Sequence, residues 1–199
     1  MMLFFYFIGN KNAPRECFKF PLLPIRDIGY NMVVNINRED GWQMHIREAE
    51  KKDIGRIMDL LSQVLEIHAK TRPDIFVPGT TKYNEEELLS ILKDSSRKIY
   101  VAAGDDDILM GYAFCEFHKQ PDSSNLVPFT SIYIDDLCVD ECFRGQHIGE
   151  KLFSHIRSEA KRMGCYEITL NVWRGNEAAE KFYEKMGFQI QKKHMEYIL

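Results

Sequence analysis

The segment from Arg144 to Gly149 (RGQHIG) has the position of a loop that opens a helix, because it joins a β-rich run to an amphipathic one. The first turn of a helix carries unsatisfied backbone N–H groups and a partial positive charge, and both attract anions. Arg144 adds a guanidinium that can bind phosphate through two hydrogen bonds. Two established phosphate motifs, G-x-G-x-x-G and G-x-x-x-x-G-K-S/T, are absent from this stretch. The loop is therefore either an anion site or a plain tight turn.

Three carboxylates in two β-rich runs are candidates for a base. Asp135 and Asp136 are adjacent in the run Ser131–Val139, so in a regular strand they point to opposite faces and only one lines a given cleft. Asp135 lies two positions before Leu137, so a regular strand would place these two side chains on the same face. Glu116, in the preceding run, is a second candidate. For each carboxylate, the alternatives are to bind a cationic substrate or to face solvent.

The loop resembles the diphosphate-binding motif of the GNAT superfamily of acetyl-CoA-dependent N-acetyltransferases, written Arg/Gln-x-x-Gly-x-Gly/Ala. Arg144 fills the first position and Gly149 the last, whereas His147 replaces the usual glycine. Its backbone N–H can still bind an anion unless the position needs a positive φ. Further on, Asn176-x-x-Ala-x-x-Phe-Tyr183, followed by x-x-x-Gly-Phe, is similar to the second signature of the family. The resemblance covers residues 44–199, which we expect to form one GNAT domain.

This resemblance implies an α+β fold: a twisted, mostly antiparallel central sheet flanked by helices. Neighbouring central strands would splay apart to admit acetyl-CoA as co-substrate. The diphosphate would lie on the loop, and the thioester beside the backbone of the preceding strand. The residues that the resemblance implies for cofactor binding are Leu137, Cys138, Val139, Arg144, Gly145, Gln146, His147, Ile148, Gly149 and Asn176.

The implied reaction is a direct attack of an amine on the thioester in a ternary complex. An alkyl amine is an ammonium ion near pH 7, so a base or a water chain must deprotonate it. Asp135 occupies the position at which the similar spermidine/spermine acetyltransferases carry a proposed glutamate base. The family motif makes Tyr183 the acid for the departing sulfur, and it shares a helical face with Asn176, seven residues earlier. A core tyrosine bonded to backbone is the alternative.

The acceptor that we expect is a small amine, such as a polyamine or an amino sugar. A protein N-terminus or a lysine side chain is the alternative within the same chemistry. A non-catalytic acyl-CoA-binding module is the alternative from another class of function.

Composition agrees with a single globular domain and limits the ligands. The chain has 199 residues, of which 45% are hydrophobic and 28% are charged. Its 26 basic and 30 acidic residues give a net charge of −4, which disfavours nucleic acid. Five cysteines without a C-x-x-C pair indicate reduced thiols and a cytoplasmic location. Neither H-E-x-x-H nor a zinc-type Cys/His spacing occurs, so we predict no metal.

The elements that must position these residues start at Met44. Asp53 is the expected N-cap of the first helix, Asn84 of the second and Asn176 of the last, and Gly187 ends that last helix. The expected elements are a short strand from 44, helices over 51–70 and 84–94, strands over 98–103, 109–118 and 131–139, a helix to about 163, a strand over 167–173, a helix from 176, and a closing strand over 189–198.

Residues 1–43 are expected to be an N-terminal extension without a domain of its own. The stretch is punctuated by proline and glycine and lacks a sustained period. Its apolar start, Met1–Ile8, is too short to cross a bilayer and lacks the preceding positive residues of a secretory signal. Met44 is an alternative natural start. The apolar material of the extension could be exchanged between two copies, so a homodimer is one expectation.

Overall fold

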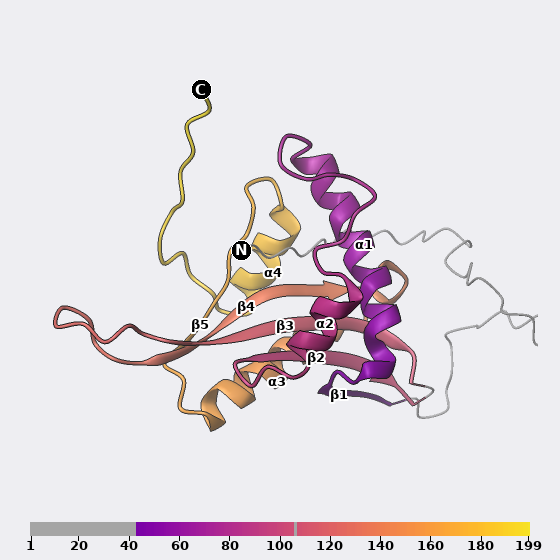
Figure 1. Cartoon of the computed structure of the whole chain (residues 1–199), viewed down its shortest axis with the longest axis horizontal. Helices are drawn as coiled ribbons and strands as arrows, with labels where there is room; N and C mark the ends of the chain where they lie inside the picture. Colours follow the sequence, from indigo (N-terminus) through magenta and orange to yellow (C-terminus); the bar gives the residue numbers. More distant parts are fainter. Residues whose placement is uncertain (1–42, 106) are drawn as a thin grey trace, which may run out of the picture.

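The computed structural model describes residues 43–105 and 107–199 (Figure 1). All but the last residue of the expected extension, and any exchange of it between two copies, lie outside the described part. The helices and strands are β1 (Met44–Glu48), the short 3-10 helix η1 (Lys51–Asp53), α1 (Ile54–Thr71), α2 (Glu85–Ile91), β2 (Arg97–Gly104), β3 (Leu109–Lys119), β4 (Thr130–Val139), the 3-10 helix η2 (Glu141–Phe143), α3 (Ile148–Arg162), β5 (Glu167–Thr169) and α4 (Glu177–Lys185).

A five-stranded sheet in the order β1-β2-β3-β4-β5 forms the centre of the described chain. Neighbouring strands from β1 to β4 are antiparallel, and β5 runs parallel to β4. Helices α1 and α2 cover one face of the sheet, and α3 and α4 cover the other (Figure 1). The predicted architecture, a mostly antiparallel sheet flanked by helices, is confirmed.

Two apolar clusters hold these layers together, because the side chains of each strand alternate between two faces. On the face of α1 and α2, Leu61 and Leu88 pack with Tyr112 of β3. On the face of α3 and α4, Leu152 and Phe182 pack with the inner strands. Since both faces are covered, a ligand can reach the centre of the sheet only through a gap between strands.

Three of the predicted helix boundaries are confirmed, and the fourth, Asp53 as the N-cap residue of α1, is confirmed in position but without a cap from its side chain. The side chain of Asn84 accepts a hydrogen bond from the backbone N–H of Glu87 (2.9 Å), and that of Asn176 caps α4. Gly187 ends α4 with a φ of 92°. Asp53 does not cap α1 with its side chain, because a 3-10 turn precedes that helix. Its carboxylate instead accepts from the N–H of Glu50 (2.7 Å) at the start of this turn.

The predicted strands near the C-terminus are too long. The fifth strand ends at Thr169 rather than at residue 173, and residues 189–198 form no strand. Large apolar side chains of the final segment, such as Ile190 and Tyr197, are exposed. Its β propensity therefore gains no burial against a neighbouring strand, and β propensity alone is weak. The segment is instead held at the C-terminal end of α1, where Arg72 pairs with Glu196 (2.9 Å).

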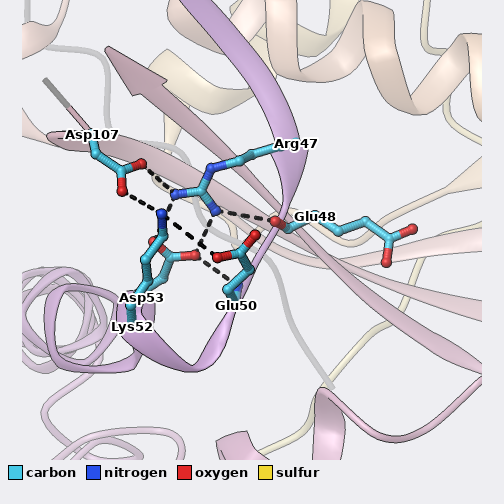
Figure 2. Close-up of polar contacts among 6 residues, drawn as sticks. All are labelled: Arg47, Glu48, Glu50, Lys52, Asp53 and Asp107. Atoms are coloured by element: carbon cyan, nitrogen blue, oxygen red, sulfur yellow. Dashed lines mark hydrogen bonds and ion pairs between the residues drawn. The ribbon is translucent and has the colours of Figure 1, made fainter. Parts of the chain in front are cut away.

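A charged network fixes the start of α1 to the turn between β2 and β3. Figure 2 shows the guanidinium of Arg47 between two carboxylates. It donates two hydrogen bonds to Asp53 (2.7 and 2.9 Å) and one to Asp107 (2.8 Å). Lys52 also pairs with Asp107, and the contacts with Lys52 and Arg47 lower the pKa of Asp107 to about 2. The network thereby fixes where α1 begins relative to the sheet.

Candidate active site

Strand β5 pairs with only the first part of β4 and leaves the rest of this edge without a paired strand. Their pairing begins at Ser131 opposite Glu167 and ends at Tyr133 opposite Thr169, whereas β4 continues to Val139. The ladder between β4 and β5 thus ends at Tyr133, and beyond it the described chain on this side has an isolated β-bridge residue, Val172. Alternate backbone N–H and C=O groups along this edge can therefore bind an extended ligand as another strand would. In the described sheet β5 is the edge strand, so the splaying of two central strands stays a prediction.

The predicted anion loop follows directly where this open edge ends. Arg144 donates from Nε to the carbonyl of Val139 (3.2 Å), and α3 begins at Ile148, so the loop leads into the first turn of a helix. Gly145 has a φ of 78° and His147 a φ of 60°. The position that the family usually gives to glycine thus does adopt the left-handed conformation, in which a histidine costs about 1 kcal/mol. The backbone N–H is nevertheless kept.

The side chain of His147 faces the last helix. Its Nδ1 lies 3.0 Å from Oε1 of Glu150, and the same carboxylate oxygen accepts from Lys185 of α4 (2.6 Å). These two partners, Lys185 first, lower the pKa of Glu150. The ring is therefore held beside the first turn of α3. The hydrogen bond from Arg144 to Val139 brings the start of the loop next to the end of β4.

A buried ion pair anchors the loop, and sequence reasoning missed it. Asp140 accepts a hydrogen bond from the N–H of Cys142 (2.7 Å) and thereby caps η2, which leads to Arg144. Arg56 of α1 pairs with the buried carboxylate of Asp140 and also donates to the carbonyl of Leu109 (3.4 Å). The two residues are 84 positions apart in the chain, so no local sequence pattern predicts their pairing.

A glycine and a buried thiol line the end of β4. A Cβ at Gly111 would lie 2.6 Å from the carbonyl oxygen of Cys138, so only glycine lets β3 approach β4 this closely. Leu137 and Val139 belong to the cluster under α3 and α4, and Cys138 to the opposite one. Burial raises the pKa of Cys138, so it stays a thiol and packs rather than attacks.

A β-bulge overturns the prediction that Asp135 and Asp136 point to opposite faces. Phe114 pairs with Asp136, but the next residue of β3, Cys115, pairs with Ile134, so Asp135 is an extra residue in β4. Ile134 and Leu137 consequently both face the cluster under α3 and α4. The two carboxylates between them bond to Tyr83 and Tyr112, whose rings both contact Phe114. Both therefore lie on the side of α1 and α2.

The two carboxylates differ in their partners. Asp135 accepts from Lys82 Nζ (2.6 Å) and Tyr83 Oη (2.9 Å) through the same oxygen, Oδ2. Asp136 accepts from Tyr112 Oη (3.0 Å). Burial raises the pKa of Asp136 to about 7; the charge of Lys82 opposes the rise, and that of Asp135 adds to it. Within the described residues, the buried Oδ1 atom of each has no hydrogen-bond partner. Sequence reasoning set Asp136 aside because it assumed a regular strand.

Glu116 lies one residue pair beyond the bulge, opposite Tyr133. Its carboxylate pairs with Arg97 of β2 (3.2 Å) and with His118 (3.1 Å), whose ring stacks on Tyr133. The structure thus places this second candidate base on the same sheet face as Asp135 but gives it other partners.

Tyr183 lies on the opposite side of the gap. It is buried in the cluster that contains Leu137 and Val139, and its ring contacts Phe188. Burial raises the pKa of Tyr183 well above 10, so the phenol keeps its proton at neutral pH. Asn176 is also buried, and its side-chain oxygen caps α4 by accepting from Ala179 N–H (3.1 Å). Asn176 and Tyr183, seven residues apart, thus belong to the same helix, as its N-cap and as a residue within it.

These features define a class of fold in which an incompletely paired strand leads through a short loop into a helix. Residues 61–188 match the Acetyltransferase (GNAT) family, and the chain belongs to this family. It is similar to the BH1408 protein of Bacillus halodurans, whose tetramutant structure shares 32% identity and a TM-score of 0.75 over 78% of this chain and 99% of that one.

Two curated relatives match different lengths of the chain. A thialysine N-epsilon-acetyltransferase of Bos taurus is 26% identical over 72% of this chain and 83% of that protein. A glucosamine 6-phosphate N-acetyltransferase of Trypanosoma brucei brucei is 32% identical over 32% of this chain. The chain matches between 34% and 41% of the length of three relatives with this activity.

The described residues show neither a membrane-spanning helix nor a metal-binding group. No helix among them has the length and apolarity that a membrane span requires. No group of three or more His, Cys, Asp or Glu side chains in that part of the chain is arranged to hold a metal ion.

The raised pKa of Asp136 predicts a pH-dependent stability. An unfolded Asp ionises near pH 4, whereas folded Asp136 ionises near pH 7, so the folded state binds the extra proton between these values. The stabilisation is fully present below pH 4 and is lost as the pH rises to 7, by at most about 1.4 kcal/mol per pH unit. Asp136→Asn removes this dependence. Urea unfolding from pH 4.5 to 8 should show the variant gaining stability relative to the parent as the pH rises.

The control for this measurement is Asp122→Asn, which changes an exposed carboxylate. Its free energy of unfolding should follow that of the parent at every pH. A difference between Asp136→Asn and the parent that stays constant across this range would contradict the prediction.

Proposed function

We propose that the chain is an acetyl-CoA-dependent N-acyltransferase that moves an acetyl group to a primary amine by direct attack in a ternary complex. The observation that carries the proposal is the open edge of β4 between Ile134 and Val139, which ends at the helix-opening loop. An extended pantetheine arm can pair with this edge while its diphosphate meets the loop. Family membership supports the same chemistry.

The residues present fit this co-substrate. The N–H groups of residues 145–149 and the guanidinium of Arg144 would bind the diphosphate, since a helix N-terminus and an arginine both favour phosphate. The backbone of Leu137 to Val139 would hold the thioester, and an N–H of this edge would stabilise the oxyanion. Acetyl-CoA supplies the activated acetyl group.

Proton transfers would take place on the two sides of the gap. An aspartate on the side of α1 and α2 takes a proton from the ammonium, and the freed nitrogen attacks the acetyl carbon. The new C–N bond forms and the C–S bond breaks. Tyr183 gives its proton to the departing sulfur, and the second proton of the nitrogen replaces it on the phenol. Its burial on the side of α3 and α4 supports this division of roles, because acid and base then flank the thioester.

Asp135 is the base that we propose first, because it is the carboxylate that already holds an ammonium group, that of Lys82 (2.6 Å). Asp136 is a second candidate on one specific observation, its pKa of about 7. A general base works best when its pKa lies near the working pH. Glu116 remains a third candidate, farther along β3.

The acceptor that we propose is a small amine. The names of the relatives, which specify glucosamine 6-phosphate and thialysine, support small amines over proteins. Acetyl transfer to a protein N-terminus or lysine is the alternative within the same site.

Two measurements test the proposed function. Acetyl-CoA titrated into the protein should release or absorb heat with 1:1 stoichiometry, and a broad panel of amines should include acceptors that release CoA thiol faster than water does. No binding of acetyl-CoA would overturn the whole assignment. Binding with hydrolysis as the only reaction would instead favour a non-catalytic acyl-CoA-binding module.

Tyr183→Phe should lower kcat by about 10- to 1,000-fold, because the departing sulfur loses its hydrogen-bond donor. The affinity for acetyl-CoA should change little, since the ring is kept. Steady-state kinetics and calorimetry of the same variant separate the two quantities. Tyr166→Phe, which changes an exposed tyrosine, is the control. Unchanged turnover of Tyr183→Phe would remove this residue from the acid role.

The base is identified by the pH dependence of kcat/KM. A base must be deprotonated, so kcat/KM should fall as the pH drops through its pKa. Asp135→Asn and Asp136→Asn are compared with the parent from pH 5.5 to 9. The variant that lowers kcat/KM by 100-fold or more and abolishes the low-pH limb has lost the base. If Asp135→Asn keeps this limb, the role passes to Asp136; if both variants keep it, neither is the base.

A further inference from the structure

The carboxylates on the acceptor side of the gap lie beneath cations. The side chain of Asp135 is 1% exposed, whereas that of Lys82, which pairs with it, is 21% exposed. The same order recurs on the neighbouring strands, where the carboxylate of Glu116 is 18% exposed and its partner Arg97 is 34% exposed. In both pairs the cation is therefore closer to solvent than the anion.

This arrangement offsets the negative charge that the acidic residues of β4 suggested from the sequence. Two adjacent aspartates favoured a polyamine as the acceptor. In the structure, Lys82 neutralises Asp135, and burial raises the pKa of Asp136 to about 7, so part of it is protonated at neutral pH. A polyamine would then meet a lysine ammonium before it met a carboxylate, and like charges repel.

Lys82 still has the capacity to bind a ligand. An ammonium has three donors, and the contacts of Lys82 with Asp135 are a hydrogen bond to Oδ2 (2.6 Å) and a longer one to the backbone carbonyl (3.4 Å). Its position is also fixed from two sides, because Nζ lies 5.4 Å from the centre of the Tyr83 ring. A donor held in this way and partly exposed can bind an anionic oxygen at little further cost in side-chain entropy.

We propose that Lys82, together with Arg97 of β2, selects acceptors that carry an acidic group, a carboxylate or a phosphate, in addition to the reacting amine. This inference rests on the proposed function and names the substrate class of the same site. The acidic group binds the exposed side of Lys82, and the amine reaches the aspartates beneath. Asp135 thus has a positioning role for Lys82 as well as the proton-accepting role proposed above.

Matched amines test the inference. Lysine is compared with cadaverine, which lacks the carboxylate, and O-phosphoethanolamine is compared with ethanolamine, which lacks the phosphate. We expect kcat/KM to be at least tenfold higher for the acidic member of one pair. The pair that shows the preference identifies the acidic group. Equal rates in both pairs, or a preference for cadaverine, would overturn the inference.

The variants separate recognition from structure. Lys82→Gln should reduce the preference to about one, mainly by raising KM for the acidic acceptor, whereas Lys82→Arg should keep it. Arg97→Gln, at the more exposed site, should reduce the preference less. Lys98→Gln changes a neighbouring lysine that pairs with Glu48 outside the site and should leave the ratio unchanged. A preference that survives both Lys82→Gln and Arg97→Gln would overturn the inference.

Equilibrium binding supplies a readout that does not depend on turnover. With CoA bound, calorimetry should show tighter binding of the acidic amine to the parent and equal binding of both members of the pair to Lys82→Gln. Circular dichroism melting shows whether Lys82→Gln folds. If it does not fold, the acceptor preferences of Arg97→Gln and Lys82→Arg are compared with that of the parent instead. If no amine of the broad panel is acetylated, the proposed function fails and this inference with it. If amines are acetylated but the cationic members are preferred, only this inference fails.

Discussion

The arrangement of the site depends on one extra residue in β4. A regular strand through this position would place one of Asp135 and Asp136 in the apolar cluster under α3 and α4, where an ionised carboxylate without a partner is very costly. The bulge keeps Ile134 and Leu137 in that cluster and turns both carboxylates toward Tyr83 and Tyr112. It comes directly after the last residue pair of β4 and β5, so the same short segment opens the sheet and supplies the polar groups beside the opening.

Burial then separates the two carboxylates chemically, although they are neighbours in the chain. Two ionised groups this close would repel, and the structure relieves the repulsion in two ways. Asp135 stays beside the lysine ammonium, whereas Asp136 has a phenol as its partner and a pKa raised to about 7. The structure therefore gives Asp135 a cation as its partner, whereas Asp136 can exchange a proton near neutral pH. Adjacent carboxylates with different environments suit a site that must both bind an ammonium and deprotonate it.

The features that the sequence predicted correctly depend on interactions between neighbouring residues in the chain. The Asn84 and Asn176 caps, the stop at Gly187 and the strands expected over 98–103 and 109–118 each follow from a few consecutive residues, and the structure confirms them. The bulge could not be predicted in this way, because register is a property of two strands. The same holds for Lys82 and Asp135, which are 53 positions apart. The supposed strand over 189–198 failed for the converse reason, since it has propensity without a partner.

A negative charge next to the predicted anion loop is neutralised by a residue from another element of the fold. Asp140 is needed at the end of β4 because its side chain caps η2, yet a buried negative charge there would repel a diphosphate bound to the following residues. Arg56 neutralises that charge from α1, and the network around Arg47 in turn fixes where α1 begins. In the proposed function, α1 would thus influence how strongly the loop attracts the diphosphate. Substitutions in α1 that shift Arg56 would therefore weaken cofactor binding without touching the loop itself.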